Sequence, residues 1–447
     1  MIRKHPLRDG ESENLRRLTR RVFLKTAAAG TSFILGPLAA ECSVGPMQSR
    51  KTGKPPRWKV HEVAKIPHGY QVAVGDVNGD GKPDILALSS EEPIVEWYEN
   101  PTWKARPVTT RTAHNISLAP RFRPNDPVRG VVLAADFSFD DSTVGGSLWW
   151  AEPPSPPEGE WPVKPIGRIP TSHRLRWADL DGDGRLELVD APIFGPGAHA
   201  PDFSVGARLT WFAVPEPLLR GHASAGDSPH GAWQSHLIDD TLPVTHGIRI
   251  MDWDGDGRDE ILTASFDGVH LFHSKGKGSE LQWTRTRLAS GEQPGRLFPG
   301  EGESKELHRG SSEIGVGKVN GKRFLATIEP WHGEQVVVYF ERAAGNPGGL
   351  WERRVIDSSF HDGHALACAD FDGDGNDEIV AGYRGPGTSL FVFSAADSSG
   401  LEWKRETLDT EMAAAGIAIE DINGDGRPDI VTIGASTGNV KWYENLG

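Results

Sequence analysis

The segment Asp370-Phe-Asp-Gly-Asp-Gly-Asn-Asp-Glu378 is one of five copies of the same nine-residue pattern. Each copy has carboxylate or amide side chains at relative positions 1, 3, 5 and 9, and glycines at positions 4 and 6. Glycine permits the left-handed backbone of a tight turn, so oxygen side chains at alternate positions converge on one point. The other copies occupy residues 76–84, 179–187, 252–260 and 421–429.

Converging oxygen ligands are typical of a calcium site, because Ca²⁺ takes oxygen atoms at about 2.3–2.6 Å. An EF-hand closes with an acid at its twelfth position and lies between helices. Here the acid at position 9 leads directly into an apolar run such as Ile85-Leu-Ala-Leu88, so we expect the loops to lie between strands. The sequence predicts up to five structural Ca²⁺ ions. The expected ligands are Asp76, Asn78, Asp80, Asp84, Asp179, Asp181, Asp183, Glu187, Asp252, Asp254, Asp256, Glu260, Asp370, Asp372, Asp374, Glu378, Asp421, Asn423, Asp425 and Asp429.

A second repeated feature, a tryptophan followed by an alternating strand pattern, indicates seven units rather than five. The tryptophans are at positions 58, 103, 161, 233, 283, 351 and 403. Successive loops begin 103, 73, 118 and 51 residues apart, and each of the two long intervals has room for one more unit. We assign these two degenerate units, which lack a complete loop, to residues 131–136 and 314–320.

Within a unit, one apolar strand precedes the loop and three strands follow it, the last beginning at the tryptophan. Four short strands per repeat are typical of a propeller blade, so the predicted fold class is all-β, a seven-bladed β-propeller of residues 57–447. Residues 57–64 form a tryptophan strand before the first blade, whereas the last unit lacks its fourth strand. We expect this N-terminal strand to join the last blade and close the ring, with the tryptophans packed between blades.

Residues 1–40 have the pattern of a twin-arginine signal peptide, because Arg20-Arg21 precedes an uncharged run at 26–40. That run is too short to span a bilayer stably. We predict export by the Tat pathway to the periplasm or extracellular space, with residues 41–56 as a linker. Cys42 is a candidate lipid-anchor cysteine, although Glu41 stands where a small residue is preferred. The only other cysteine, Cys368, lies in an apolar strand, so no internal disulfide is expected.

The formal net charge of -14 is explained by the loops, whose expected ligands include 18 carboxylates. An acidic chain of this kind is not expected to bind nucleic acid. No phosphate loop or dinucleotide fingerprint is present in the sequence.

The strand order places the calcium loops on one face and nine of the 16 histidines on the other. The long excursions at 190–205 and 289–312 lie on that second face, and loops of this length are usually functional. Neutral imidazoles suit Zn²⁺ and also serve as general acids or bases near neutral pH. The nine are His68, His114, His173, His199, His246, His308, His332, His361 and His364.

Beside these histidines stand Glu313, Glu329, Trp331, Tyr383 and Arg384, a set suited to binding a sugar. An aromatic ring offers a stacking surface, and arginine or histidine can polarise hydroxyl and carbonyl oxygens. Trp331 is equally well explained by packing within a blade.

Two resemblances follow from these motifs. The loop units resemble the FG-GAP/VCBS repeats of integrin-type propellers. The segments His308-Arg-Gly-Ser-Ser-Glu-Ile314, Glu329-Pro-Trp-His-Gly333, Phe360-His-Asp-Gly-His364 and Gly382-Tyr-Arg-Gly385 resemble the propeller part of the aldos-2-ulose dehydratase family. The resemblance implies a lyase that removes water from keto or anhydro sugars, with a metal in the propeller. The cupin domains of that family, associated with a later isomerisation, have no counterpart in residues 58–447.

We therefore predict an exported metal-dependent carbohydrate lyase that performs β-elimination on a small keto or anhydro sugar. The catalytic metal, Zn²⁺ or another divalent ion, is assigned to His246, His308 and His364, with Glu313 or His332 as a further ligand. His361 is the expected base, with Tyr383, Arg384 and His332 as further catalytic residues, and Trp331, His173 and His68 are expected to bind the sugar. The alternative is a non-enzymatic calcium-stabilised propeller that binds a carbohydrate or a protein.

Overall fold

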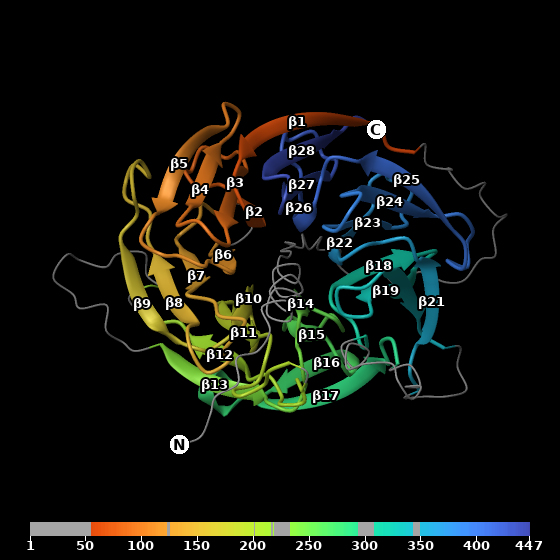
Figure 1. The fold of residues 1–447 in the computed structure, drawn as a ribbon, viewed down its shortest axis with the longest axis horizontal. Coiled ribbons are helices and arrows are strands. Elements are labelled where there is room, and N and C mark those ends of the chain that lie inside the picture. Colours follow the sequence, from red (N-terminus) through yellow and green to blue (C-terminus); the bar gives the residue numbers. More distant parts are fainter. Residues whose placement is uncertain are drawn as a thin grey trace, which may run out of the picture.

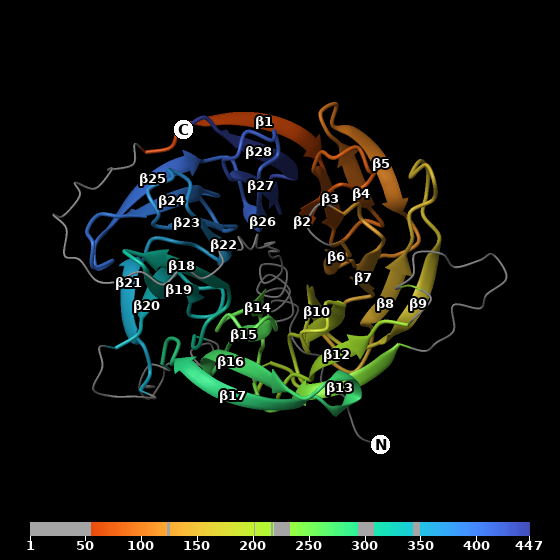
Figure 2. The ribbon, with the colours of Figure 1, turned by 180° about the vertical axis from the view of Figure 1, so that it is seen from behind.

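Seven four-stranded antiparallel sheets surround a central axis in the computed structural model, which is the seven-bladed β-propeller expected (Figure 1; Figure 2). The structure describes residues 55–122, 126–200, 202–215, 218, 233–293, 308–342 and 349–447. The predicted signal peptide, Cys42 and the predicted linker up to residue 54 lie outside these ranges, as does most of the 289–312 excursion.

The first strand of each blade lies nearest the axis, and the following strands lie progressively further out (Figure 1). The innermost strands are β2 (Gly69–Gly75), β6 (Ser117–Pro120), β10 (Ser172–Ala178), β14 (Gly247–Met251), β18 (Ile314–Val319), β22 (Gly363–Ala369) and β26 (Ala414–Glu420). The second strands are β3 (Asp84–Ser89), β7 (Val131–Ala135), β11 (Glu187–Pro192), β15 (Glu260–Ser265), β19 (Lys322–Glu329), β23 (Glu378–Tyr383) and β27 (Asp429–Gly434).

The third strands are β4 (Val95–Glu99), β8 (Ser147–Ala151), β12 (Leu209–Ala213), β16 (Gly268–Lys275), β20 (Gln335–Phe340), β24 (Leu390–Ala395) and β28 (Asn439–Asn445). The outer strands are β5 (Lys104–Thr109), β9 (Val163–Arg168), β13 (Gln234–Asp239), β17 (Gln282–Ala289), β21 (Glu352–Asp357), β25 (Trp403–Asp409) and, in the last blade, β1 (Trp58–Lys65). A 3₁₀ turn, η1 (Gly278–Glu280), follows β16.

The depth of each strand explains its sequence. Strand β3 is buried throughout, because both faces of a central strand pack against neighbouring blades, and it therefore reads as the continuous apolar run Ile85-Leu-Ala-Leu88. Strand β1 lies at the rim, where one face meets solvent, so polar and apolar residues alternate along it. The sequence alternation at each tryptophan thus marks the outer strand.

The ring closes between the two ends of the propeller. Strand β1 pairs antiparallel with β28, with Trp58 opposite Asn445 and Lys65 opposite Asn439. The N-terminal strand thus occupies the position expected for it, as the fourth strand of the last sheet. Pairing within this sheet covers the outer edge that β28 would otherwise expose.

The expected packing of the tryptophans between blades is confirmed. Trp103 of the first blade lies edge-on to Trp442 of the last, with ring centroids 5.7 Å apart. Trp403 makes the same kind of contact with Phe324 of the preceding blade at 5.3 Å. Each of these rings buries a large apolar area at a blade boundary, which holds neighbouring sheets in a fixed orientation.

The count of seven units is right, but one degenerate unit was placed on the wrong strand. Residues 131–135 form β7, the second strand of its blade, and the innermost strand is the short β6. The stretch was misassigned because an apolar run predicts burial, and first and second strands are both buried. Residues 314–319 do form an innermost strand, β18, which continues through the tight turn Asn320-Gly321 into β19.

Two further observations concern the cysteine and membrane-spanning helices. Cys368, in β22, is a free cysteine. Among the residues described, no helix is long and apolar enough to cross a membrane.

Candidate functional site

The five acidic loops each join the first and second strands of a blade, and the acid at position 9 is the first residue of the second strand. That acid accepts a hydrogen bond from the backbone amide at position 2, which folds the loop back on itself. The pairs are Asp84 with Val77, Glu187 with Leu180, Glu260 with Trp253, Glu378 with Phe371, and Asp429 with Ile422. The repeated spacing therefore builds the same loop in five blades.

The remaining acids of a loop gather over its turn. In the last blade the two oxygens of Asp421 accept hydrogen bonds from the amides of Gly424, Asp425 and Gly426. In the loops at 179–187, 252–260 and 370–378, the acids at positions 1, 3 and 5 bring one oxygen each within 4.8 Å of one another. Oxygen atoms grouped in this way fit a hard cation such as Ca²⁺.

The crowding of carboxylates in each loop affects the pKa of the buried acid at position 9. Burial raises their pKa, and neighbouring loop carboxylates raise it further, to about 8 for Glu378 and about 7 for Asp84, Glu187 and Glu260. Asp370 adds an oxygen, Oδ1, that is buried and has no hydrogen-bond partner among the described residues. A divalent cation would favour the ionised form of such groups, so the donor set fits the expected calcium.

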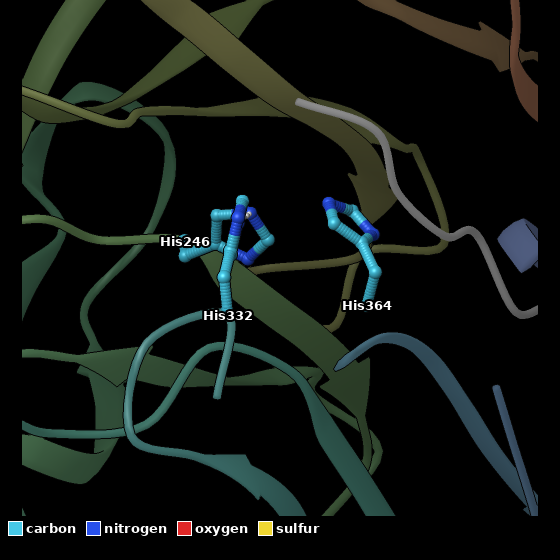
Figure 3. A group of neighbouring side chains, drawn as sticks. All are labelled: His246, His332 and His364. Atoms are coloured by element: carbon cyan, nitrogen blue, oxygen red, sulfur yellow. Dashed lines mark hydrogen bonds between the residues drawn. The ribbon is translucent and has the colours of Figure 1, made fainter. Parts of the chain in front are cut away.

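On the opposite face, His246, His332 and His364 form a compact group (Figure 3). One ring nitrogen from each lies within 4.8 Å of the other two, and the Nε2 atoms of His246 and His332 are 2.8 Å apart. The three come from separate blades: His246 immediately precedes β14, His332 lies between β19 and β20, and His364 is in β22. Three imidazoles at this range are a donor set for Zn²⁺ or a similar ion.

The orientation of His246 is fixed from behind. Its Nδ1 lies 2.7 Å from the Ser312 carbonyl oxygen and 3.3 Å from Glu313 Oε1. An acceptor behind Nδ1 holds the proton there and leaves the Nε2 lone pair directed into the histidine group. Burial and the nearby positive charge of Arg174 lower the pKa of His246 to about 4, so its ring is neutral at pH 7.

His332 is positioned by the turn and by two charged neighbours. Its backbone is left-handed, with φ of 53°, and its Nε2 lies beside that of His246. Nδ1 lies 3.2 Å from an Arg384 nitrogen and 3.4 Å from Asp362 Oδ1, and Arg384 donates to that same carboxylate at 2.9 Å. Asp362 offsets the buried charge of Arg384 and stands within reach of the His332 ring.

Buried cations surround the histidine group. Arg174 of β10 donates to Glu313, which precedes β18 two blades further round the ring, and its other terminal nitrogen lies 3.1 Å from His173 Nε2. Further along β10, burial and the neighbouring charge of Arg174 lower the pKa of Arg176 to about 9. Arg174 and Arg384 are each paired with a carboxylate, Glu313 and Asp362 respectively, so both guanidinium groups are held in place beside the histidine group.

The structure brings together some of the predicted site residues and leaves others apart. His308 is exposed and outside the histidine group, so His332 takes the third position that was assigned to it. Glu313 lies behind His246 rather than among the three ring nitrogens. His173 adjoins the group, with its ring 4.8 Å from that of His246.

His361 and His68 are exposed, and His68 lies 3.5 Å from Glu91 at the rim of its loop. The Tyr383 ring packs against Phe360 and Phe391, with His361 edge-on to it at 5.9 Å. Glu329 ends β19 and accepts a hydrogen bond from Arg353 of β21 in the same blade.

Trp331 is 7% exposed and contacts three phenylalanines, so the structure favours the packing interpretation over a sugar platform. Its partners are Phe194, Phe203 and Phe266, with ring centroids 5.5–6.2 Å away. The centroid of the Trp331 ring is also 4.9 Å from that of the His332 ring, so the tryptophan packs against this histidine.

Sequence reasoning missed Arg174, Asp362 and Ser312. A signal existed for Arg174, because it interrupts a strand that is otherwise expected to be buried. Asp362 stands between two predicted site residues, His361 and His364. Ser312 contributes only a backbone carbonyl, which no side-chain pattern identifies.

Comparison with known proteins places this geometry in context. Residues 145–342 match the model of the β-propeller domain of aldos-2-ulose dehydratase, a segment that carries Arg174, His246, Glu313 and His332. Residues 370–432 match an FG-GAP-like repeat, and residues 68–90 match an FG-GAP repeat. The chain is a seven-bladed FG-GAP-repeat propeller resembling that of aldos-2-ulose dehydratase.

Two curated relatives resemble this FG-GAP propeller over part of their length. Aldos-2-ulose dehydratase from Phanerodontia chrysosporium is 27% identical over 324 residues, covering 67% of this chain and 33% of the relative. Rhamnogalacturonan exolyase YesX from Bacillus subtilis is 27% identical over 340 residues, covering 66% and 52%. The chain thus spans about a third and about half of the lengths of these proteins.

Among solved structures, the Cps50 (Swd1) β-propeller domain of Myceliophteria thermophila aligns with a TM-score of 0.48 at 10% identity. The alignment covers 87% of this chain and 99% of that chain.

Proposed function

We propose that this protein is an exported, metal-dependent carbohydrate lyase that eliminates water or an alcohol from a keto or anhydro sugar. The observation that carries the proposal is the convergence of His246, His332 and His364. Similarity to a dehydratase and to a polysaccharide lyase supports a carbohydrate-active propeller. Export by the Tat pathway and calcium in the five loops are parts of the same proposal.

The three histidines would hold a divalent cation, Zn²⁺ or a similar ion. When bound, such an ion polarises a carbonyl oxygen as a Lewis acid. Ser312 and Glu313 fix the ring of His246 from behind, and Asp362 with Arg384 does the same for His332. Residues that orient metal ligands in this way raise metal affinity, so these four act as positioning residues.

The buried arginines contribute to the elimination itself. Removing a proton next to a carbonyl moves negative charge onto the carbonyl oxygen. Arg174 and Arg384 bring fixed positive charge to the histidine group, and their partners Glu313 and Asp362 keep both guanidinium groups in place. Preorganised charge of this kind stabilises a developing oxyanion without reorganisation during the reaction.

Proton transfer is assigned to the exposed His361 and to the buried Tyr383 beside it. His361 is accessible to a substrate, and its backbone oxygen accepts a 2.7 Å hydrogen bond from Gly385, which ties it to the segment after β23. In this scheme His361 takes the proton next to the carbonyl, the carbon–oxygen bond on the adjacent carbon breaks, and Tyr383 protonates the departing oxygen. The products are an unsaturated sugar and water or an alcohol.

The proposal is tested with 2-keto and 3-keto sugars by following the absorbance of the conjugated enone. His364→Ala should abolish turnover, because the group loses a ring that is fully buried within it. His308→Ala is the matched control, since His308 is exposed and outside the group, and it should retain wild-type turnover. Sugar binding without turnover by the wild type would instead identify a binding propeller.

A further inference from the structure

The residue after the third-strand aromatic occupies an equivalent place beside each acidic loop. Sheet register defines it, because the first apolar residue of the second strand pairs with that aromatic in each blade. The pairs are Ile85 with Tyr98, Leu188 with Phe212, Ile261 with Phe272, Ile379 with Phe393 and Ile430 with Tyr443. The next residues are Glu99, Ala213, His273, Ser394 and Glu444, so the fourth blade alone of these five has an imidazole there.

A side chain at this place reaches position 3 of the adjacent loop. In the last blade, Glu444 Oε1 accepts a 3.3 Å hydrogen bond from the amide of Asn423. In the fourth blade, His273 Nε2 lies 4.0 Å from Oδ2 of Asp254, the equivalent loop residue. The approach of His273 to the loop is therefore imposed by strand pairing.

His273 completes a group of three potential ligands with Asp254 and Glu260, one atom from each lying within 4.8 Å of the others. Glu260 is 2% exposed, and its Oε2 accepts the Trp253 amide. Across the described ranges, no hydrogen bond to Glu260 Oε1 is found, so one carboxylate oxygen of this residue remains available to a cation.

The distance from His273 Nε2 to Asp254 Oδ2 is too long for a hydrogen bond but suits two ligands of one ion. A hydrogen bond between these atoms would require about 2.7–3.2 Å. Two ligands at about 2.0–2.2 Å from a tetrahedral Zn²⁺ lie about 3.3–3.6 Å apart. Closing the 4.0 Å separation therefore takes a side-chain movement of well under ~1 Å.

In the first and last blades the equivalent side chain is an acid that has a basic partner. Glu444 pairs with Lys59 at 3.1 Å and His61 at 2.7 Å, and Glu99 pairs with Arg106 at 2.7 Å. His273 makes no hydrogen bond to any residue within the described part of the chain, and it is about one-third exposed. Its ring nitrogen is thus available on the side that faces the loop.

We propose that the fourth-blade loop, with His273, Asp254 and Glu260, is a mixed nitrogen–oxygen site for a divalent transition ion of the Zn²⁺ class. Imidazole is a ligand that Zn²⁺ and its neighbours accept readily, whereas Ca²⁺ prefers oxygen donors throughout. The fourth blade therefore differs from the four all-oxygen loops in the metal it selects. The site is on the face opposite the His246 group and does not depend on the proposed lyase activity.

The test is a Co²⁺ titration of the full-length protein in excess Ca²⁺, with bound metal counted after removal of free ions. His273→Ser should bind one Co²⁺ fewer than wild type, because it reproduces the Ser394 arrangement of the sixth blade. Counting the difference separates this site from the His246 group, whether or not that group binds Co²⁺. His199→Ser, an exposed histidine on the opposite face, should bind the same amount as wild type.

A reciprocal variant adds the ligand elsewhere. Ser394→His places an imidazole beside Asp372 and should bind one Co²⁺ more than wild type. Loss of one equivalent in His273→Ser supports the proposal. An unchanged Co²⁺ count in His273→Ser, with folding verified by its thermal melt, overturns it.

Discussion

Removing calcium should destabilise the whole propeller, and the structure allows the size of the effect to be worked out. Extracellular calcium modules bind with Kd of about 10⁻⁴ to 10⁻³ M. At about 10 mM Ca²⁺, each site bound only in the folded state adds about 1.4–2.7 kcal/mol of stability. Five loops then give about 7–14 kcal/mol, or about 9–17 °C in Tm for a propeller of this length.

The loss should appear in one cooperative transition, because the loops also tie neighbouring blades together. The side chains of Asn100, Ser274 and Asn445 each donate to the carbonyl at position 2 of the preceding blade's loop, at Ile422, Leu180 and Phe371. A loop that opens without its ion therefore releases a contact in the next blade as well.

Thermal melts with Ca²⁺ and with a chelator measure this directly. Asp425→Asn, which weakens one loop, should reduce the calcium-dependent shift by about one-fifth if the five sites contribute equally. Asp140→Asn changes an exposed acid outside the loops and should leave the shift intact. A Tm that is the same with calcium and chelator would refute the reasoning.

Three further outcomes are expected. Burial raises the pKa of Asp190 to about 8, so the folded state favours the proton and stability falls as pH rises from about 4 to 8. Asp190→Asn should flatten that dependence in urea unfolding at pH 5 and 9, and an unchanged profile would contradict the assignment. Arg174→Met leaves Glu313 buried without its cation and should lower the free energy of unfolding by about 3–5 kcal/mol. The double variant Arg174→Met with Glu313→Gln should lose less, and equal losses in the single and double variants would exclude the ion pair as the cause. Asn445→Ala removes the bond to the Phe371 carbonyl and should cost about 1–3 kcal/mol in chemical denaturation, whereas a loss below about 0.3 kcal/mol would show that water replaces it.

The fold could be predicted from the sequence because the chain consists of repeated units. The loop spacing and the tryptophan spacing are independent periodicities, and both gave seven units. Position 9 of each loop proved to be the first residue of a strand, since an acid followed by apolar residues marks that boundary. The one misplaced strand, β7, is buried as deeply as an innermost strand, so apolar character alone could not separate them.

The site was accessible only in part. His246 and His364 stand at the entries of innermost strands, where topology alone directs them toward the axis. His332 joins them and has a left-handed backbone, whereas His308 is exposed and lies outside the group. These outcomes depend on loop backbone angles, which a pattern of residue types does not encode.

The most direct measurement is the metal content and lyase activity of the same protein samples, compared among wild type, His364→Ala and His308→Ala. We predict that His364→Ala contains one divalent transition ion fewer than wild type and produces no enone from a keto sugar. His308→Ala should match wild type in both respects. Full turnover by His364→Ala, or an unchanged metal content, would contradict a metal-dependent elimination at His246, His332 and His364.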